Sequence, residues 1–261
     1  MDFLFADETN VQPSEKNNVK FFVYGGLIVP VKSIDAIHEK VSLIRDQYGY
    51  KYTDSLKFDS RSRPDNVSIE DFSSIKNELI EYAIKMDCCS LFYVVHHEIA
   101  KNQDMQVITK WGADHIVSKF NNRLQERDKQ GVVIMDRLPN SEEYGFLSEK
   151  FSTGLVYEDK TTSLDKIRLF AASCDNASNL SSMSDIVLGS FRYCVNNPSN
   201  FQAAKKMMKN LVRLIWSGKK GSTIHPFEKG LTFRPQPSDV KVPKYKSDYD
   251  TLLTQLNSLL K

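Results

Sequence analysis

Two apolar runs that each close on an aspartate constrain the fold of this chain more than any other feature. They are DFLFAD at residues 2–7 and GVVIMDRL at residues 131–138, which place acids at Asp7 and Asp136. A third acid, Asp185, stands at the entrance of the apolar segment DIVLGSF. A carboxylate at the end of a buried element is costly to desolvate unless a cation, a hydrogen-bond donor or a metal ion compensates its charge. The three acids together therefore indicate a shared metal site.

The apolar runs alternate along the chain with amphipathic segments, and this alternation predicts an α/β sheet. Strands are expected at residues 2–7, 19–29, 89–95, 131–138 and 167–173. The first two are joined by a polar loop and predict an antiparallel hairpin. The last three are apolar enough for central strands that are covered on both faces.

Helices are predicted where apolar residues recur three or four positions apart. Ser33 is a candidate cap for the first helix, and Ser68 for a second helix whose inward stripe begins at Ile69. Trp111 is among the expected inward residues of a long helix, and Asp185 is expected to open a later one. The predicted helices follow Ser33 and Ser68 and then cover residues 98–128, 184–197, 201–216 and 249–260.

The charge of the chain is unevenly distributed. Its net charge is only +2, but residues 200–261 carry 12 Lys or Arg against 4 Asp or Glu, so this tail is about +8 and the rest about −6. A length of 261 residues fits one elaborated domain. We expect a main domain over residues 1–198 and a basic helical extension over residues 199–261 that packs on it. A basic lobe beside an acidic body is typical of a nucleic-acid contact surface next to a carboxylate site.

Basic residues of this extension are candidates for nucleic-acid binding. The helix at 201–216 has an apolar stripe, and its cations occupy mainly other faces. These cations can track a phosphate backbone, which would make binding depend strongly on salt. The alternative is a solvated surface helix packed on the sheet. The candidates are Lys205, Lys206, Lys209, Arg213, Lys219 and Lys220.

Several classes of site and location are disfavoured. The four cysteines form no CxxC pair and show no zinc spacing, so we expect buried thiols in a reducing compartment. His96 and His97 lack a third ligand at a zinc spacing. P-loop and GxSxG motifs are absent from the sequence. No run approaches the roughly twenty apolar residues that span a bilayer, and the N-terminus has acids where a signal peptide has Lys or Arg. We expect a cytoplasmic protein without a membrane partner.

Three carboxylates would supply oxygen ligands, which suit Mg²⁺ or Mn²⁺. These ions keep further coordination positions for water and phosphate oxygens. Two such ions about 4 Å apart activate a water molecule and stabilise the leaving oxygen of a phosphodiester. Glu8 is a further candidate ligand beside Asp7. The period of two in a strand points it to the opposite face, unless the strand has already ended.

The ordered motifs resemble those of the domain of unknown function 3800 family, a branch of the ribonuclease H-like superfamily. The resemblance covers about residues 1–196 and rests on FADETN, FFVYGGLIV, SLKF, VVIMDR and SSMSDIVLGSFRY. It implies a ribonuclease H-like mixed sheet with an antiparallel N-terminal hairpin, flanking helices and a C-terminal helical extension. It also implies a nuclease activity and a bacterial mobile-element or defence setting.

Residue by residue, the resemblance implies metal ligands at Asp7, Asp136 and Asp185, with Glu8 and Lys57 as further catalytic residues. The ammonium of Lys57 would meet a phosphate or orient a carboxylate. Two positions depart from the family pattern. Its Ser and Gly after the Asp-Glu pair are Thr9 and Asn10 here, and its acid two positions before the lysine is Ser55.

Alternatives remain at each of these positions. Asp7 and Asp136 can cap loops or pair with Arg137 or Arg192, and Asp185 can be a helix-start acid that interacts with the macrodipole. The main functional hypothesis is a metal-dependent nuclease that cleaves RNA or DNA. Its alternatives are an inactive nucleic-acid-binding or partner-controlled module, and a phosphotransferase acting on small nucleotides. The sequence leaves open a protein partner and an oligomeric state.

Overall fold

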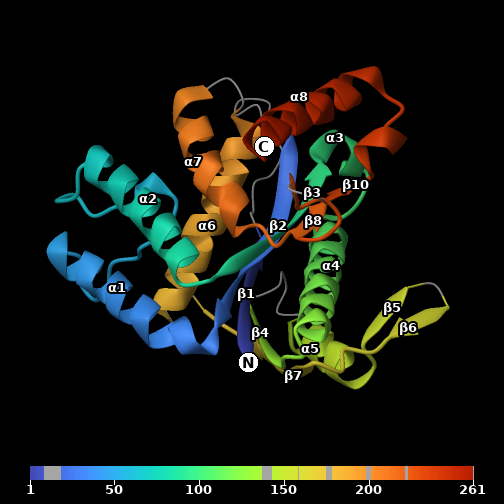
Figure 1. Cartoon of the computed structure of the whole chain (residues 1–261), viewed down its shortest axis with the longest axis horizontal. Helices are drawn as coiled ribbons and strands as arrows, with labels where there is room; N and C mark the ends of the chain where they lie inside the picture. Colours follow the sequence, from blue (N-terminus) through green and yellow to red (C-terminus); the bar gives the residue numbers. More distant parts are fainter. Residues whose placement is uncertain are drawn as a thin grey trace.

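A six-stranded mixed sheet forms the centre of the computed structural model (Figure 1), which describes residues 1–8, 19–136, 143–157, 159–174, 178–197, 201–220 and 223–260. The strand order is β10-β3-β2-β1-β4-β7. The strands are β1 (Asp2–Glu8), β2 (Phe21–Pro30), β3 (Cys89–His96), β4 (Gly131–Met135), β7 (Ile167–Ala172) and β10 (Leu231–Arg234).

Strand direction decides where the ends of these strands meet. β2 is antiparallel to β1 and β3, whereas β4 runs parallel to β1, β7 parallel to β4 and β10 parallel to β3. The carboxyl ends of β1, β4 and β7 therefore lie at one edge of the sheet. The predicted mixed α/β sheet with an N-terminal antiparallel hairpin is confirmed, and so are its flanking helices.

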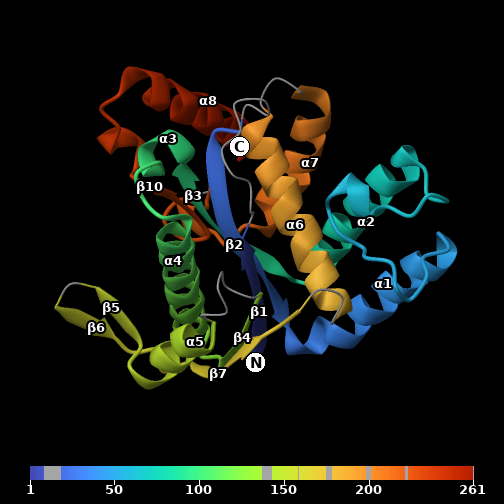
Figure 2. The same ribbon diagram turned by 180° about the vertical axis from the view of Figure 1, so that it is seen from behind.

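Helices cover both faces of the sheet, as the two opposite views show (Figures 1 and 2). One face carries α1, α2, α6 and α7, and the other carries α4 and α5. The helices are α1 (Ile34–Gln47), α2 (Ile69–Lys85), α3 (His97–Ala100), α4 (Met105–Glu126), α5 (Glu143–Ser152), α6 (Asn179–Asn196), α7 (Phe201–Leu214) and α8 (Pro243–Leu259). Small hairpins are formed by β5 (Leu155–Tyr157) with β6 (Lys160–Thr162) and by β8 (Gly218–Lys220) with β9 (Thr223–His225).

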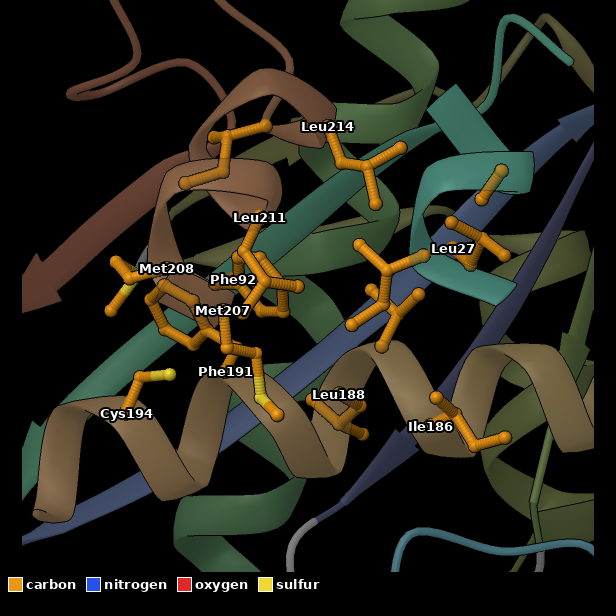
Figure 3. Close-up of a cluster of buried hydrophobic side chains, with 14 of the residues drawn as sticks. Leu27, Phe92, Ile186, Leu188, Phe191, Cys194, Met207, Met208, Leu211 and Leu214 are labelled. Atoms are coloured by element: carbon orange, nitrogen blue, oxygen red, sulfur yellow. The ribbon is translucent and has the colours of Figure 1, made fainter. Parts of the chain in front are cut away.

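The larger of two apolar clusters lies between the sheet and the helices α1, α2, α6 and α7. Figure 3 shows side chains of α6 and α7 meeting those of β2 and β3. The rings of Phe92 on β3 and Phe191 on α6 are stacked, with centroids 3.8 Å apart. The second cluster fills the space between the sheet and α4. Burial on both faces fixes the register of the central strands, since a slip by one residue would exchange the two sets of side chains.

Several sequence predictions need correction. The helix expected at 98–128 is interrupted after α3, and α4 starts anew where the Asp104 side chain accepts a hydrogen bond from the N–H of Gln106. Trp111 and Ile69 are 49% and 65% exposed rather than inward. Ser68 caps α2 as predicted, but the Ser33 hydroxyl donates to a carbonyl instead of capping α1.

The sheet edges also differ from the prediction. β7 is an edge strand with several exposed side chains rather than a central one. Residues after 199 are not only helical, because they supply β10 to the main sheet and bury Leu211 and Tyr249 in the larger cluster. No helix in the described ranges combines the length and apolar character needed to cross a membrane.

Candidate active site

Asp7 and Asp136 are brought together by the parallel pairing of β1 and β4. Ala6 is paired with Met135, so Asp7 and Asp136 are the next residues along the two strands. The N–H of Asp136 donates to the carbonyl of Ala6 at 3.0 Å, which extends the pairing by one step. Because side chains alternate between faces and Phe5 packs in the α6-side cluster, Asp7 points toward α6. Asp136, in the matching register, points the same way.

Helix α6 supplies the third acid. The Ser184 hydroxyl donates to the carbonyl of Phe5 at 2.9 Å and fastens the helix to β1. The next residue is Asp185. The helix begins at Asn179, with the Ser178 side chain as its cap, so Asp185 lies in its second turn. Asp185 therefore is not the helix-start acid that the sequence suggested, since interaction with the macrodipole is confined to the first turn.

All three aspartates and Lys57 line one cleft, whose empty volume is about 500 Å³. Serines at 181, 182 and 184 give α6 a small, polar surface here. Sequence reasoning missed Ser181, although the SSMS run before Asp185 signals a polar helix face. Among the described atoms, the buried Oγ of Ser181 has no hydrogen-bond partner. The lining consists of Phe5, Ala6, Asp7, Lys57, Ile134, Asp136, Ser173, Cys174, Ser181, Ser182, Ser184 and Asp185.

The loop that carries Lys57 docks directly on α6. The N–H of Phe58 donates to Oδ2 of Asp185 at 2.6 Å. Gly189, one turn after Asp185, permits this approach, because a Cβ there would lie 2.4 Å from the Cβ of Phe58. The Lys76 ammonium lies over the Phe58 ring, 4.5 Å from its centroid. These contacts fix the backbone beside Lys57 and orient one oxygen of Asp185.

The surroundings of Asp7 strongly disfavour the charged form of its carboxyl group. Burial, together with the charges of Asp136 and Asp185, raises its pKa from 3.8 to about 8. The N–H of Glu8 donates to Oδ1 of Asp7 at 2.6 Å and opposes this rise only in part. A carboxyl group that prefers to hold a proton at neutral pH, beside two other carboxyl groups, is a place where a divalent cation would replace that proton.

Glu8 lies apart from these residues. β1 continues through Glu8, so alternation directs its side chain to the α4 face, where Thr109 hydrogen-bonds to it. Burial and the charge of Asp136 raise the pKa of Glu8. Glu8 is not among the residues that line the cleft of Asp7. The structure thus brings four of the five predicted catalytic residues together and leaves Glu8 across the sheet.

The predicted alternatives for the aspartates involve two arginines. Arg137 lies outside the described residues. Arg192 is half-buried on α6, two turns beyond Asp185; burial lowers its pKa, and the charges of Asp185 and Asp59 oppose this. Arg192 therefore shares the electrostatic neighbourhood of the cleft, and sequence reasoning identified it only as a structural partner.

The aspartates share a cleft, but they do not form a ready-made set of metal ligands. Within the described ranges, no three His, Cys, Asp or Glu side chains form a group that could hold a metal ion. The basic residues predicted to bind nucleic acid lie elsewhere. Lys205, Lys206, Lys209 and Arg213 are exposed on α7, and the side chains of Lys219 and Lys220 lie outside the described part of the chain.

Comparison with known proteins gives only distant similarity. No protein-family model matches the chain, so the resemblance to the domain of unknown function 3800 family stays a prediction. No curated protein matches it either.

Two solved structures are similar over 100% of this chain, each with a TM-score of 0.43. One is RNase HII from Archaeoglobus fulgidus, in complex with PCNA, at 12% identity and with 92% of that chain covered. The other is ribonuclease H2 from Pyrococcus horikoshii OT3, at 15% identity and with 100% of that chain covered. Similarity at this level carries nothing about activity, substrate or site residues.

Proposed function

We propose that this protein is a metal-dependent phosphodiester hydrolase of the ribonuclease H-like class, acting on RNA or DNA. One observation carries the proposal: three aspartates from β1, the end of β4 and α6 line a single cleft with Lys57. Here the mutual repulsion of the aspartates contributes to raising the pKa of Asp7 to about 8.

The residues fit a Mg²⁺ or Mn²⁺ ion by their chemistry. Hard divalent cations take carboxylate oxygens together with water and phosphate oxygens. Backbone N–H groups donate to Oδ1 of Asp7 and to Oδ2 of Asp185, and so hold both carboxylates in fixed orientations at the cleft. When bound, such an ion lowers the pKa of a coordinated water and neutralises charge on the phosphate.

The remaining cleft residues would position the substrate. The Lys57 ammonium supplies a positive charge for a non-bridging phosphate oxygen. The unpartnered hydroxyl of Ser181 is a donor for a second oxygen. The Phe58 and Glu8 amides hold Asp185 and Asp7 in orientation, which limits the reorganisation needed during the reaction.

Helix α7 offers a second candidate surface for nucleic acid, outside the cleft. Its cations project from the exposed side of the helix, while Ala204, Met208 and Leu211 are buried against the core. We place the sequence-independent part of binding on this surface, through Lys206, Lys209 and Arg213. The length of α7 then gives a path along the phosphate backbone outside the cleft.

The test is Asp136→Asn, assayed for Mn²⁺-dependent cleavage of single-stranded and duplex RNA and DNA. The expected result is a folded protein whose cleavage rate falls by at least about a hundredfold, since removal of one catalytic electrostatic group costs on the order of 10²–10³. Asp250→Asn is the matched control, because Asp250 is exposed on α8. An Asp136→Asn protein that cleaves at the wild-type rate would refute the proposal.

A further inference from the structure

A second hollow lies on the opposite face of the sheet, between α4, α5 and β5. Its empty volume is about 1040 Å³. Charges within it nearly cancel, because Lys110 and Lys150 stand beside Asp114 and Glu149. A near-neutral hollow favours an uncharged planar group over a phosphate. Its lining includes Lys110, Trp111, Asp114, Phe146, Lys150 and Val156.

Trp111 gives the hollow a stacking surface. Its side chain is 49% exposed, whereas the other tryptophan of the chain, Trp216, is 7% exposed. Phe146 and Val156 add apolar walls. Lys150 is only 5% exposed, with its Nζ 3.2 Å from Oδ1 of Asp114, so a polar pair lies within reach of whatever stacks on the indole. An aromatic face with buried hydrogen-bonding groups beside it is what recognition of an unpaired nucleobase requires.

Helix α4 connects the hollow with the end of β1 that carries Asp7. Glu8, next to Asp7, is hydrogen-bonded by Thr109, and Lys110 and Trp111 follow directly on α4. The ring of Tyr24 packs tightly on this helix, because a Cβ at Gly112 would lie 2.6 Å from the Tyr24 Cβ. Burial raises the pKa of Tyr24, and charges from both sites, including Asp7 and Asp114, raise it further.

We propose that the hollow between α4, α5 and β5 is a nucleobase subsite, in which Trp111 stacks an unpaired base of the strand whose phosphate enters the Asp7 cleft. The inference rests on the proposed function for the identity of that strand as the substrate. It assigns the protein a single-stranded or locally unpaired substrate, because a base within a duplex has no free face to offer the indole. The phosphates run over the sheet edge, and the base turns toward α4.

Tryptophan fluorescence tests the subsite separately from catalysis. The full-length protein is titrated in chelator with a single-stranded oligonucleotide and with an abasic sugar-phosphate strand of equal length, while fluorescence anisotropy of a label on the strand reports binding. Base stacking should quench Trp111 with the first strand and leave it unchanged with the second. Trp111→Ala should weaken oligonucleotide binding by about 5- to 150-fold, the loss of one base-aromatic stack, and Trp111→Phe should restore part of it.

Phe151→Ala is the matched control. Phe151, on α5, is exposed and aromatic like Trp111, but it lines a different hollow. It should bind like wild type. Strand binding without quenching of Trp111 would overturn the subsite, and so would a dimer that Trp111→Ala converts to monomer, since a protein would then cover the indole. Asp136→Asn should keep the quenching. If Asp136→Asn also keeps cleavage, the proposed metal site fails while the subsite stands.

Discussion

The raised pKa of Asp7 predicts an unusual dependence of stability on pH in the metal-free protein. In the unfolded chain Asp7 loses its proton near pH 3.8, but in the fold it does so near pH 8. Between these values the native state holds one proton more than the unfolded state, so the free energy of unfolding falls as pH rises, by about 1.4 kcal/mol per pH unit.

The window from about pH 7 to 8 shows this effect best. Burial lowers the pKa of His97 from 6.5 to about 4 and that of His115 to about 3, so the unfolded chain still loses protons from both residues near pH 6.5, and their contribution, of opposite sign, has largely faded above pH 7. Urea unfolding in chelator should therefore show a net loss of roughly 0.7 kcal/mol across this pH unit, from about 1 kcal/mol lost through Asp7 and about 0.3 kcal/mol gained through the two histidines. Asp7→Asn should remove this loss and raise stability at the upper end.

Two comparisons complete this experiment. Asp250→Asn should retain the slope, because Asp250 is exposed on α8. Saturating Mn²⁺ should remove the slope from wild type by replacing the proton on Asp7, and it should stabilise wild type more than Asp7→Asn. A flat wild-type profile, or a slope that persists in Asp7→Asn, would refute the electrostatic account of the cleft.

Three further predictions concern the loop, the core and the basic surface. Gly189→Ala should displace Phe58 and reduce the cleavage rate by on the order of a hundredfold, with folding retained. Gly218→Ala is its control and should leave the rate unchanged, because the atoms nearest to the added Cβ belong to the Lys229 side chain and lie at least 3.2 Å away. Asp2→Ala should lower the free energy of unfolding by about 3–5 kcal/mol in urea titrations, because it leaves a buried arginine without its carboxylate; a loss below about 1 kcal/mol would contradict this. In α7, replacing Lys206 and Lys209 together with glutamine should weaken nucleic-acid binding similarly for all sequences and reduce the salt slope by about two; an unchanged slope would show that strands bind elsewhere.

The sequence was most informative where local pattern and sheet geometry agree. Asp7 and Asp136 follow apolar strands, and parallel pairing alone suffices to place such residues side by side. Periodicity also gave the correct side for Glu8, whereas the family resemblance grouped it with the aspartates. Local pattern failed at Asp185, because α6 begins six residues earlier, at Asn179, in a polar stretch whose Ser184 hydroxyl is bonded to β1.

Other features depend on contacts between distant segments. The docking of Phe58 on Gly189 joins residues that are far apart in the chain, and no local sequence pattern at either residue predicts this contact. β10 is four residues long, so its run carries too little periodicity to distinguish an edge strand from a loop. Trp111 was expected to face inward together with Phe120, but Phe120 is buried with Ile108 and Ile116, whereas Trp111 is exposed.

The two ends of β1 show how this fold treats acids that serve different purposes. At its start, Asp2 is fully buried, yet Arg123 lies 2.5 Å and Lys129 3.1 Å from its carboxylate oxygens. At its end, Asp7 has Asp136 and Asp185 as its main charged neighbours. Removing the carboxylate should therefore destabilise the protein at Asp2 and stabilise it, without metal, at Asp7. Opposite signs within one strand cannot come from strand propensity or burial alone, and they would identify the cleft as a place where stability is given up for cation binding.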